Sequence, residues 1–351
     1  MLYPLTFKSV YKERVWGGRN LENLLGRKLP EGKIGESWDL CNHKNGMSIV
    51  ENGDLAGETL AELMAEYKET LMGQDYNASG YFPLLIKVLD ANDQLSVQVH
   101  PDDEYAYKVE KEAGKTEAWY VLAAKADAKI IYGLKEEITK ETFRAAVKAG
   151  NVMACLREVP VKKGDLIYVP SGSVHALLEG VVVYEVQQNS NTTYRVYDYN
   201  RVDQEGQTRE LHTEKALEVI SFGGQAAVDF NRDSITCPYF KMQKMRLEKE
   251  IPDATQDRFL IYCIISGQGK ISYRNGAVTV RQGETVLIPA ELGEFKVSGG
   301  LEFLRISTRQ LGHYVMFISR LKTINQRVRS HHSSQTVPSF ADASRCSCTC
   351  I

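Results

Sequence analysis

A short stretch near residue 100 places polar side chains where a strand would bury them. In LSVQVH, residues 95–100, apolar positions alternate with Ser96, Gln98 and His100, which predicts a strand with these three side chains on one face. The neighbouring segments read as fully buried, so this polar face should be buried as well. Burying an unpaired amide and imidazole is costly, and a metal ion bound by both would remove that cost.

Two further residues could join Gln98 and His100 in such a site. Glu117 precedes the apolar run of EAWYVLAA, and His175 lies in the loop of PSGSVHAL. Two imidazoles, a carboxylate and an amide oxygen suit Zn²⁺ or another divalent first-row metal and leave room for water or substrate. Either histidine alone would more often be a hydrogen-bonded structural residue. Their order on consecutive strand-like runs favours a metal site formed by these four residues.

The segments that carry these residues belong to a chain that is mainly β. Short apolar or alternating runs recur at the spacing typical of β-sandwiches and barrels, namely FPLLIKVLDA, LSVQVH, EAWYVLAA, AKIIYGL, DLIYVPS, VVVYEVQQ, FLIYCIIS, KISYR, ETVLIPA and LEFLRIS. Helical periodicity is found at residues 57–72, and at 140–149 together with the following NVMACLREV. We expect these helices to be insertions that pack on a β framework.

An internal repeat divides the β framework into two related units. KKGDLIYVPSGSVHAL, from Lys162, matches RQGETVLIPAELGEFKV, from Arg281, and EAWYVLAA then lies opposite FLIYCIIS. His175 follows Pro170 by five residues, whereas Glu294 holds the corresponding position in the second copy. Two related β-barrel units are predicted, and only the first keeps a histidine here.

The segment after about residue 313 differs from everything before it. It is rich in Ser, Arg and Thr and lacks a strand or helix period, so we expect residues 313–351 to be a disordered or extraneous tail. Cys348 lies four residues from the end, as prenylation requires, but Thr349 is not aliphatic and we expect no lipidation. His331 and His332 could bind metal adventitiously, and a disordered tail is the preferred interpretation.

Composition limits the classes of partner. The chain has 351 residues, with 43 basic and 45 acidic side chains and a net charge of −2, which argues against nucleic acid and anionic membrane surfaces as partners. No apolar run is long enough to cross a bilayer, and the first thirty residues lack a signal-peptide pattern. A cytoplasmic protein is therefore expected. Its scattered cysteines are expected to be buried free thiols, at Cys41, Cys155, Cys237 and Cys263.

Several motifs resemble those of one enzyme family. QVHPDD at 98–103, GKTEAWYVL at 114–122, PSGSVHAL at 170–177 and QNSNTTYRVYDYNR at 188–201 resemble type I mannose-6-phosphate isomerases of the short bacterial form. ERVWGGRNL at 13–21 and GESWDL at 35–40 resemble the N-terminal signatures of that family. The resemblance runs in order from the start of the chain to about residue 310.

The resemblance implies a zinc-dependent enzyme that interconverts mannose 6-phosphate and fructose 6-phosphate, with one Zn²⁺ per chain. It implies a cupin (jelly-roll) fold, with a catalytic metal-binding domain at 1–235 and a second, metal-free domain at 236–312. The family's zinc ligands fall on His100, Glu117 and His175, and Gln98 matches a fourth ligand that water could replace. The family's catalytic arginine falls on Arg195.

The chemistry of such an isomerase requires further catalytic groups. Moving a proton between C1 and C2 through a cis-enediol needs a base and a stabiliser of the developing negative charge. Arg195 can stabilise that charge but cannot serve as the base, because its guanidinium stays protonated. Glu185, in VVVYEVQQ, resembles the family's proposed glutamate base. The alternative is that Glu185 pairs structurally with Arg195.

A phosphate group on the substrate calls for cations and hydroxyls. Lys87 and Lys115 match lysines of the family pattern, and Ser96 could donate a hydroxyl, although Lys87 could instead be a lysine at the core edge. Arg14 and Arg201 are weaker candidates.

Two other functions fit part of the pattern. An iron-dependent cupin oxygenase would use two histidines and a carboxylate, and a non-enzymatic cupin would bind a sugar phosphate without converting it. Arg195 and the lysines favour the isomerase over the oxygenase, and the intact ligand set disfavours a protein that only binds sugar.

Overall fold

The computed structural model describes residues 2–76, 80–202, 206–223 and 229–309. The predicted tail at 313–351, with His331, His332 and Cys348, lies outside these residues. None of the helices in the described ranges is both long and apolar enough to cross a membrane.

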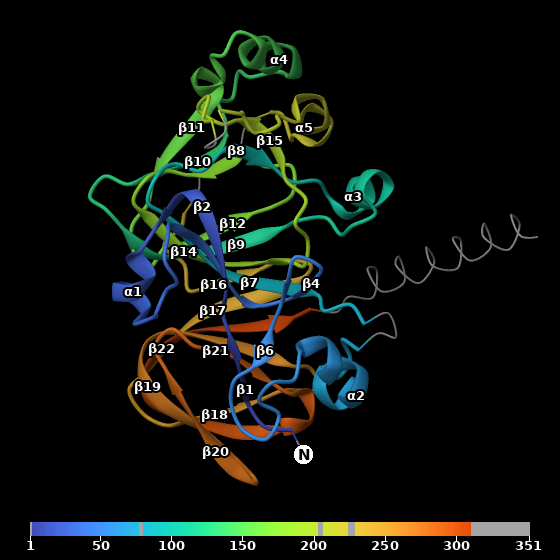
Figure 1. The fold of residues 1–351 in the computed structure, drawn as a ribbon, viewed down its shortest axis with the longest axis vertical. Coiled ribbons are helices and arrows are strands. Elements are labelled where there is room, and N and C mark those ends of the chain that lie inside the picture. The colour runs from blue at the N-terminus through green and yellow to red at the C-terminus, as the bar shows by residue number, and fades with distance from the viewer. Residues whose placement is uncertain (1, 77–79, 203–205, 224–228, 310–351) are drawn as a thin grey trace, which may run out of the picture. The chain divides into compact units, whose positions relative to one another are not determined.

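Three antiparallel sheets and a small hairpin account for most of the regular secondary structure in the described chain, which confirms the mainly β prediction (Figure 1). The six-stranded sheet has the order β12 (Leu166–Val169), β9 (Glu117–Ala124), β14 (Val181–Gln188), β7 (Leu84–Ala91), β3 (Ile34–Leu40), β2 (Val10–Gly18). The five-stranded sheet has the order β11 (Leu156–Pro160), β10 (Lys129–Leu134), β13 (His175–Leu177), β8 (Val97–Val99), β15 (Tyr194–Tyr197).

The C-terminal third forms a nine-stranded sheet that also takes in strands from the N-terminus. Its main path is β16 (Ser234–Thr236), β17 (Phe240–Leu247), β22 (Glu294–Thr308), β19 (Leu260–Tyr273), β21 (Thr285–Ile288), β1 (Leu5–Lys8), β6 (Ile49–Val50). β18 (Ile251–Ala254) pairs with β22, β20 (Gly276–Arg281) pairs with β19, and β4 (Asn42–His43) forms a hairpin with β5 (Gly46–Met47). The domain boundary at residue 235 remains a prediction. β1 and β6 precede this boundary in the sequence but pair into the sheet formed by the residues that follow it.

The six-stranded sheet is covered on both faces. Trp119 and Val183 pack with Ile130 of the five-stranded sheet on one side. On the other side, Tyr184 and Val186 share a core with strands of the nine-stranded sheet. A strand covered on both faces needs apolar residues at nearly every position, which is why VVVYEVQQ reads as a continuous apolar run. Glu185 is therefore a carboxylate inside a closed layer.

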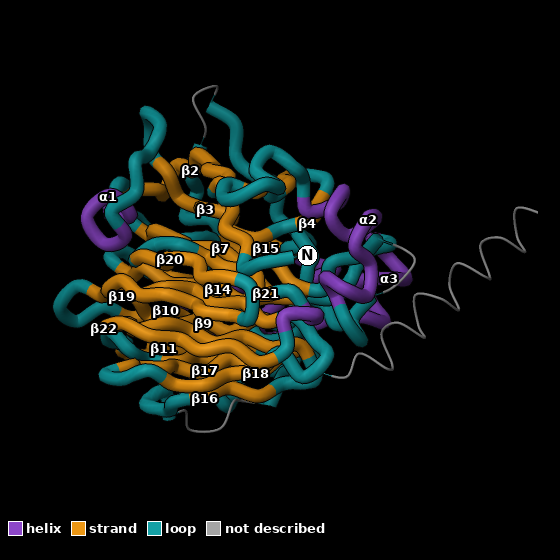
Figure 2. Tube along the Cα trace, turned by 90° about the horizontal axis from the view of Figure 1, so that it is seen from below, coloured by secondary structure: helices purple, strands orange, loops and turns teal. Residues whose placement is uncertain are grey.

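Five α-helices in the described residues lie on the outside of the stacked sheets (Figures 1 and 2). They are α1 (Asn20–Leu25), α2 (Leu60–Met72), α3 (Asp103–Glu110), α4 (Lys140–Lys148), α5 (Thr213–Val219). The predicted helices at 57–72 and 140–149 correspond to α2 and α4. α4 and α5 cover the outer face of the five-stranded sheet, where Phe143 and Leu217 pack against Val97 and Val99.

The helix expected to continue through NVMACLREV is a wrong prediction. α4 ends before Gly150, whose φ of +69° departs from a helical backbone. The chain then forms one short 3₁₀ turn at Val152–Cys155 and enters strand β11. Val152, Cys155 and Leu156 are buried in the core between α4 and the five-stranded sheet, and their spacing in the sequence resembles that of a helix.

The hydrogen bonding of the two units supports the internal repeat. Asp165 accepts a bond from the amide of Lys162, and Glu284 accepts the same bond from Arg281. β9 pairs with β12 as β19 pairs with β21, and the register places Leu260 at the position of Glu117. The letter-by-letter alignment of EAWYVLAA with FLIYCIIS is therefore one residue out of register. The second unit lacks the carboxylate as well as the histidine.

The four cysteines in the described residues are buried and free, as expected.

Candidate metal centre and adjoining pocket

Two rows of directly paired residues face each other between the five- and six-stranded sheets. Residues opposite each other on neighbouring strands point to the same face of a sheet. The six-stranded sheet supplies the row Trp38, Lys87, Glu185, Trp119. The five-stranded sheet supplies the row Tyr132, His175, Gln98, Arg195. Strand pairing thus brings together residues that are far apart in the sequence.

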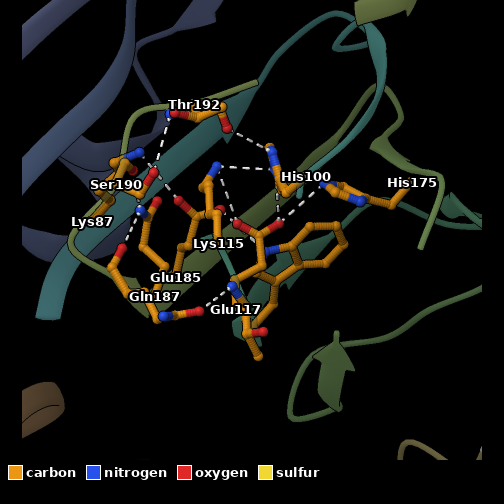
Figure 3. A network of polar contacts seen from close by, with 12 residues as sticks. Lys87, His100, Lys115, Glu117, His175, Glu185, Gln187, Ser190 and Thr192 are labelled. Carbon is orange, nitrogen blue, oxygen red and sulfur yellow. Dashed lines mark hydrogen bonds and ion pairs between the residues drawn. The ribbon is translucent and has the colours of Figure 1, made fainter. Parts of the chain in front are cut away.

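His100, Glu117 and His175 form a buried cluster (Figure 3). The Oε1 atom of Glu117 lies 3.0 Å from Nε2 of His175 and 3.7 Å from Nε2 of His100. Ligands of a tetrahedral zinc site, each 2.0–2.1 Å from the metal, are separated by about 3.3 Å. The spacing of the cluster therefore suits a small divalent ion.

Each histidine is held by its other ring nitrogen. Nδ1 of His100 lies 3.0 Å from the carbonyl oxygen of Thr192, and Nδ1 of His175 lies 2.9 Å from that of Ser173. A carbonyl only accepts, so Nδ1 must carry the proton and donate it. The lone pair of each neutral ring is then on Nε2, which is the atom turned toward Glu117. This arrangement is typical of metal-binding histidines.

The loop that supplies the Thr192 carbonyl is itself fixed by amide side chains. Nε2 of Gln187 donates to the carbonyl oxygens of Gln188 and Ser190, both at 2.7 Å. Nδ2 of Asn189 donates to the carbonyls of Asn42 and Phe82. The QNSNTT segment therefore holds the orientation of His100.

Unsatisfied atoms in the cluster indicate what is missing from it. Both carboxylate oxygens of Glu117 and Nε2 of His175 are buried and make no hydrogen bond within the described residues. The nearest cation is Lys115, whose Nζ lies 3.3 Å from Glu117 and 3.0 Å from Nε2 of His100. Buried acceptors without donors are unfavourable, and a divalent cation would satisfy all of them. The donor set therefore fits a metal. Gln98 lies beside His175 in the same row, and its role as a ligand remains a prediction.

Glu185 lies in the buried row opposite the cluster. It is 3.3 Å from the ammonium of Lys87 and accepts a hydrogen bond of 3.2 Å from the indole of Trp119. Burial and the nearby charge of Glu117 raise the pKa of Glu185. Within the described residues its ion pair is with Lys87 and not with Arg195, so the structural pairing considered from the sequence is not observed.

The side chain of Arg195 points toward Ser96, which lies outside the row that contains Arg195. Its Nε donates to Oγ of Ser96 at 3.3 Å, and its Nη1 donates to the carbonyl of Glu210 at 2.9 Å. Burial and the neighbouring charge of Arg209 lower the pKa of Arg195.

A pocket of about 460 Å³ adjoins the cluster. The sequence-predicted residues Lys87, Ser96, Gln98, Lys115, Glu185 and Arg195 line it. The cluster of His100, Glu117 and His175 does not line the pocket. Lys115 connects the two, because it lines the pocket and also contacts His100 and Glu117.

The pocket also contains charged residues that the sequence analysis missed or ranked low. Glu36 accepts bonds of 2.7 Å from Nε of Arg14 and from the indole of Trp38. Burial opposes its charge, but Lys87 and Arg14 outweigh that effect and lower the pKa of Glu36 to about 2. The alternation of Glu36 and Trp38 with buried neighbours in GESWDL was the available signal. Arg209 also lines the pocket, and no sequence pattern marked it.

Two family models match the chain. One describes the catalytic domain of type I phosphomannose isomerase and matches residues 5–133, and the other describes the mannose-6-phosphate isomerase cupin domain and matches 232–308.

Curated relatives and a solved structure match most of the chain. The mannose-6-phosphate isomerase ManA of Bacillus subtilis is 43% identical over 310 residues, which are 85% of this chain and 97% of that protein. The mannose-6-phosphate isomerase of Streptococcus mutans is 39% identical over 87% of this chain and 98% of its own length. A crystal structure of the mannose 6-phosphate isomerase from Bacillus subtilis superposes with a TM-score of 0.80 at 35% identity, covering 86% of this chain and 99% of that one.

Proposed function

Because the chain belongs to the type I mannose-6-phosphate isomerase family, we propose that it interconverts mannose 6-phosphate and fructose 6-phosphate. The observation that carries this proposal is the buried cluster of His100, Glu117 and His175 beside a pocket lined by lysines and arginines. A metal centre next to a cationic pocket suits the isomerisation of an anionic sugar. The substrate would be a free small molecule, and we propose that the protein works in the cytoplasm.

The metal would be one Zn²⁺ per chain. His100, Glu117 and His175 would hold it, with Gln98 or a water molecule as a fourth ligand. When bound, zinc would act as a Lewis acid toward the oxygens on C1 and C2 of the substrate.

Glu185 would transfer the proton between C1 and C2 and so form and collapse the cis-enediol. It is a carboxylate in a closed layer, beside the cluster and at the pocket wall. Lys87 pairs with Glu185 and would keep its carboxylate oriented toward the substrate. The structural alternative, in which Glu185 only balances Lys87, predicts normal turnover in a Glu185→Gln variant.

Arg195 would stabilise the negative charge that develops on the enediol oxygens. Its Nη2 has no acceptor within the described residues, so one edge of the guanidinium is available to a ligand. Lys115 and Ser96 also line the pocket and would contact the sugar. Together with the closed sheets, these side chains would exclude water from the reacting carbons.

The experiment that tests this function measures fructose 6-phosphate formed from mannose 6-phosphate, and oxygen uptake in parallel. We expect isomerisation without oxygen consumption. Oxygen uptake with bound iron would support the oxygenase, and binding of mannose 6-phosphate without turnover would support a protein that only binds sugar.

A further inference from the structure

The charged side chains of the pocket differ in burial from one end to the other. The side chains of Lys87, Lys115 and Glu185 are 5%, 6% and 4% exposed, and these residues lie beside the metal cluster. The side chains of Arg14 and Arg209 are 36% and 33% exposed. The pocket therefore has an inner end with buried lysines and an outer end with arginines that solvent can reach.

The inner lysines are already engaged by carboxylates. Lys87 is paired with Glu185, and Lys115 is paired with Glu117. A phosphate dianion at this end would have to compete with both carboxylates for the lysines inside a closed layer. The inner end therefore suits the neutral, reacting part of a sugar better than a phosphate group.

The outer arginines have donors to spare. Nε and Nη2 of Arg209 donate to the carboxylate of Asp198. Nε of Arg14 donates to Glu36, and its Nη1 donates to the carbonyl of Glu13. Nη1 of Arg209 and Nη2 of Arg14 have no acceptor within the described residues. Each guanidinium is thus fixed by a carboxylate while one of its nitrogens remains unpaired.

The pocket would carry a surplus of positive charge once a divalent cation is bound beside it. Five cations line it, at Arg14, Lys87, Lys115, Arg195 and Arg209, against three carboxylates, at Glu13, Glu36 and Glu185. Glu117 and Asp198, which pair with Lys115 and Arg209 from outside the lining, bring the carboxylates to five, so these charges balance without a metal. A divalent cation held by the cluster would add the two positive charges that match a phosphate monoester, which carries about −1.5 to −2 charges at pH 7. Arginine also offers the planar pair of donors that phosphate oxygens accept.

We propose that Arg209 and Arg14 bind the phosphate of the substrate at the outer end of the pocket. The inference rests on the proposed function for the identity of the phosphorylated ligand. It moves the phosphate from Lys87 and Lys115, where the sequence suggested it, to the arginines. The sugar carbons then extend inward to Glu185 and the metal cluster.

Arg201 provides a matched control for Arg209, because both arginines donate to Asp198. Arg201 donates to the same carboxylate, at 2.7 Å, and to the carbonyl of Gln94, but it does not line the pocket. Arg201→Gln and Arg209→Gln each remove one guanidinium from Asp198, so any general effect of exposing that carboxylate is common to both. Only Arg209→Gln removes a donor from the pocket.

The experiment measures KM and kcat for mannose 6-phosphate and the inhibition constant of inorganic phosphate in the metal-loaded proteins. Loss of one charge-assisted bond should raise KM and the phosphate inhibition constant about 10- to 100-fold in Arg209→Gln and in Arg14→Gln. We expect kcat to change less than about threefold, and Arg201→Gln to behave as wild type. The rise in wild-type KM with ionic strength should be smaller in both pocket variants.

Two results would overturn the proposal: an unchanged KM in Arg209→Gln or Arg14→Gln, or an equal rise in Arg201→Gln. Failure of the proposed function is distinguishable from these. If the protein does not isomerise mannose 6-phosphate, calorimetric titration with mannose 6-phosphate and with inorganic phosphate still compares the variants. Weaker binding in Arg209→Gln and Arg14→Gln alone would support the phosphate site in a protein without the activity.

Discussion

Replacing Arg195 by alanine separates two roles that its position allows. The residue shares a row with Gln98 and His175, which places its backbone next to the metal cluster. Its guanidinium, however, reaches toward Ser96 and lies close to Arg209. It could therefore stabilise the enediolate at the inner end or contribute to phosphate binding at the outer end.

The proposed catalytic role predicts a loss in kcat. A preorganised charge acting on a developing oxyanion in a closed site is worth ~3–4 kcal/mol, so kcat should fall on the order of 10²- to 10³-fold. KM should hardly change, because the interaction is made mainly in the transition state. Arg195→Lys should recover part of the loss, since it keeps the charge but not the planar fork.

The structural cost of Arg195→Ala should be small and measurable separately. The side chain gives up two hydrogen bonds to neutral acceptors, each worth about 1 kcal/mol. Neither acceptor holds a metal ligand, so zinc content should stay at the wild-type level. Steady-state kinetics with metal analysis test this. A raised KM with normal kcat, together with nearly normal kinetics in Arg195→Lys, would refute the catalytic role and assign Arg195 to the phosphate.

Three further predictions concern the cluster and two ion pairs formed by carboxylates of strand β3. His175→Ala should lower zinc affinity by at least about 10- to 100-fold and reduce activity in parallel, and full activity in a metal-free variant would show that His175 is structural. Glu36 has a pKa of about 2 when folded, against 4.5 ordinarily, so its charge should stabilise the fold fully above pH 4.5 and lose that effect as the pH falls toward 2. In urea unfolding, the free energy of unfolding of the wild type should fall at low pH by at most about 3 kcal/mol, and the Glu36→Gln variant should lack this decrease. Identical pH profiles of the unfolding free energy in wild type and variant would contradict the assignment. Arg27→Ala should destabilise the protein by about 3–5 kcal/mol, because it leaves the buried carboxylate of Asp39 without its guanidinium, and a cost below about 1 kcal/mol would contradict this.

The grouping of His100, Glu117 and His175 was predictable because these residues break local rules. His100 follows an alternating strand, and Glu117 directly precedes an apolar run, so each is a polar group where burial is expected. Glu185 stands out in VVVYEVQQ for the same reason. The strands themselves were predictable from period and composition, and β7, β9 and β14 lie where the apolar runs lie.

The remaining features depend on contacts between distant segments. Arg209 lies in a polar stretch after β15, and only the folded chain shows that it lines the pocket. The carbonyl oxygens of Thr192 and Ser173 orient the histidines, and a backbone group leaves no mark in residue type. The helix predicted beyond Gly150 failed because short apolar segments pack equally well as a 3₁₀ turn and an edge strand.

Metal loading tests the central claim most directly. Protein stripped with a chelator would be titrated with Zn²⁺, while bound metal and conversion of mannose 6-phosphate to fructose 6-phosphate are measured on the same samples. The cluster of His100, Glu117 and His175 predicts that activity rises in proportion to bound zinc and saturates at one ion per chain. Undiminished isomerase activity in protein that contains no metal would contradict the account.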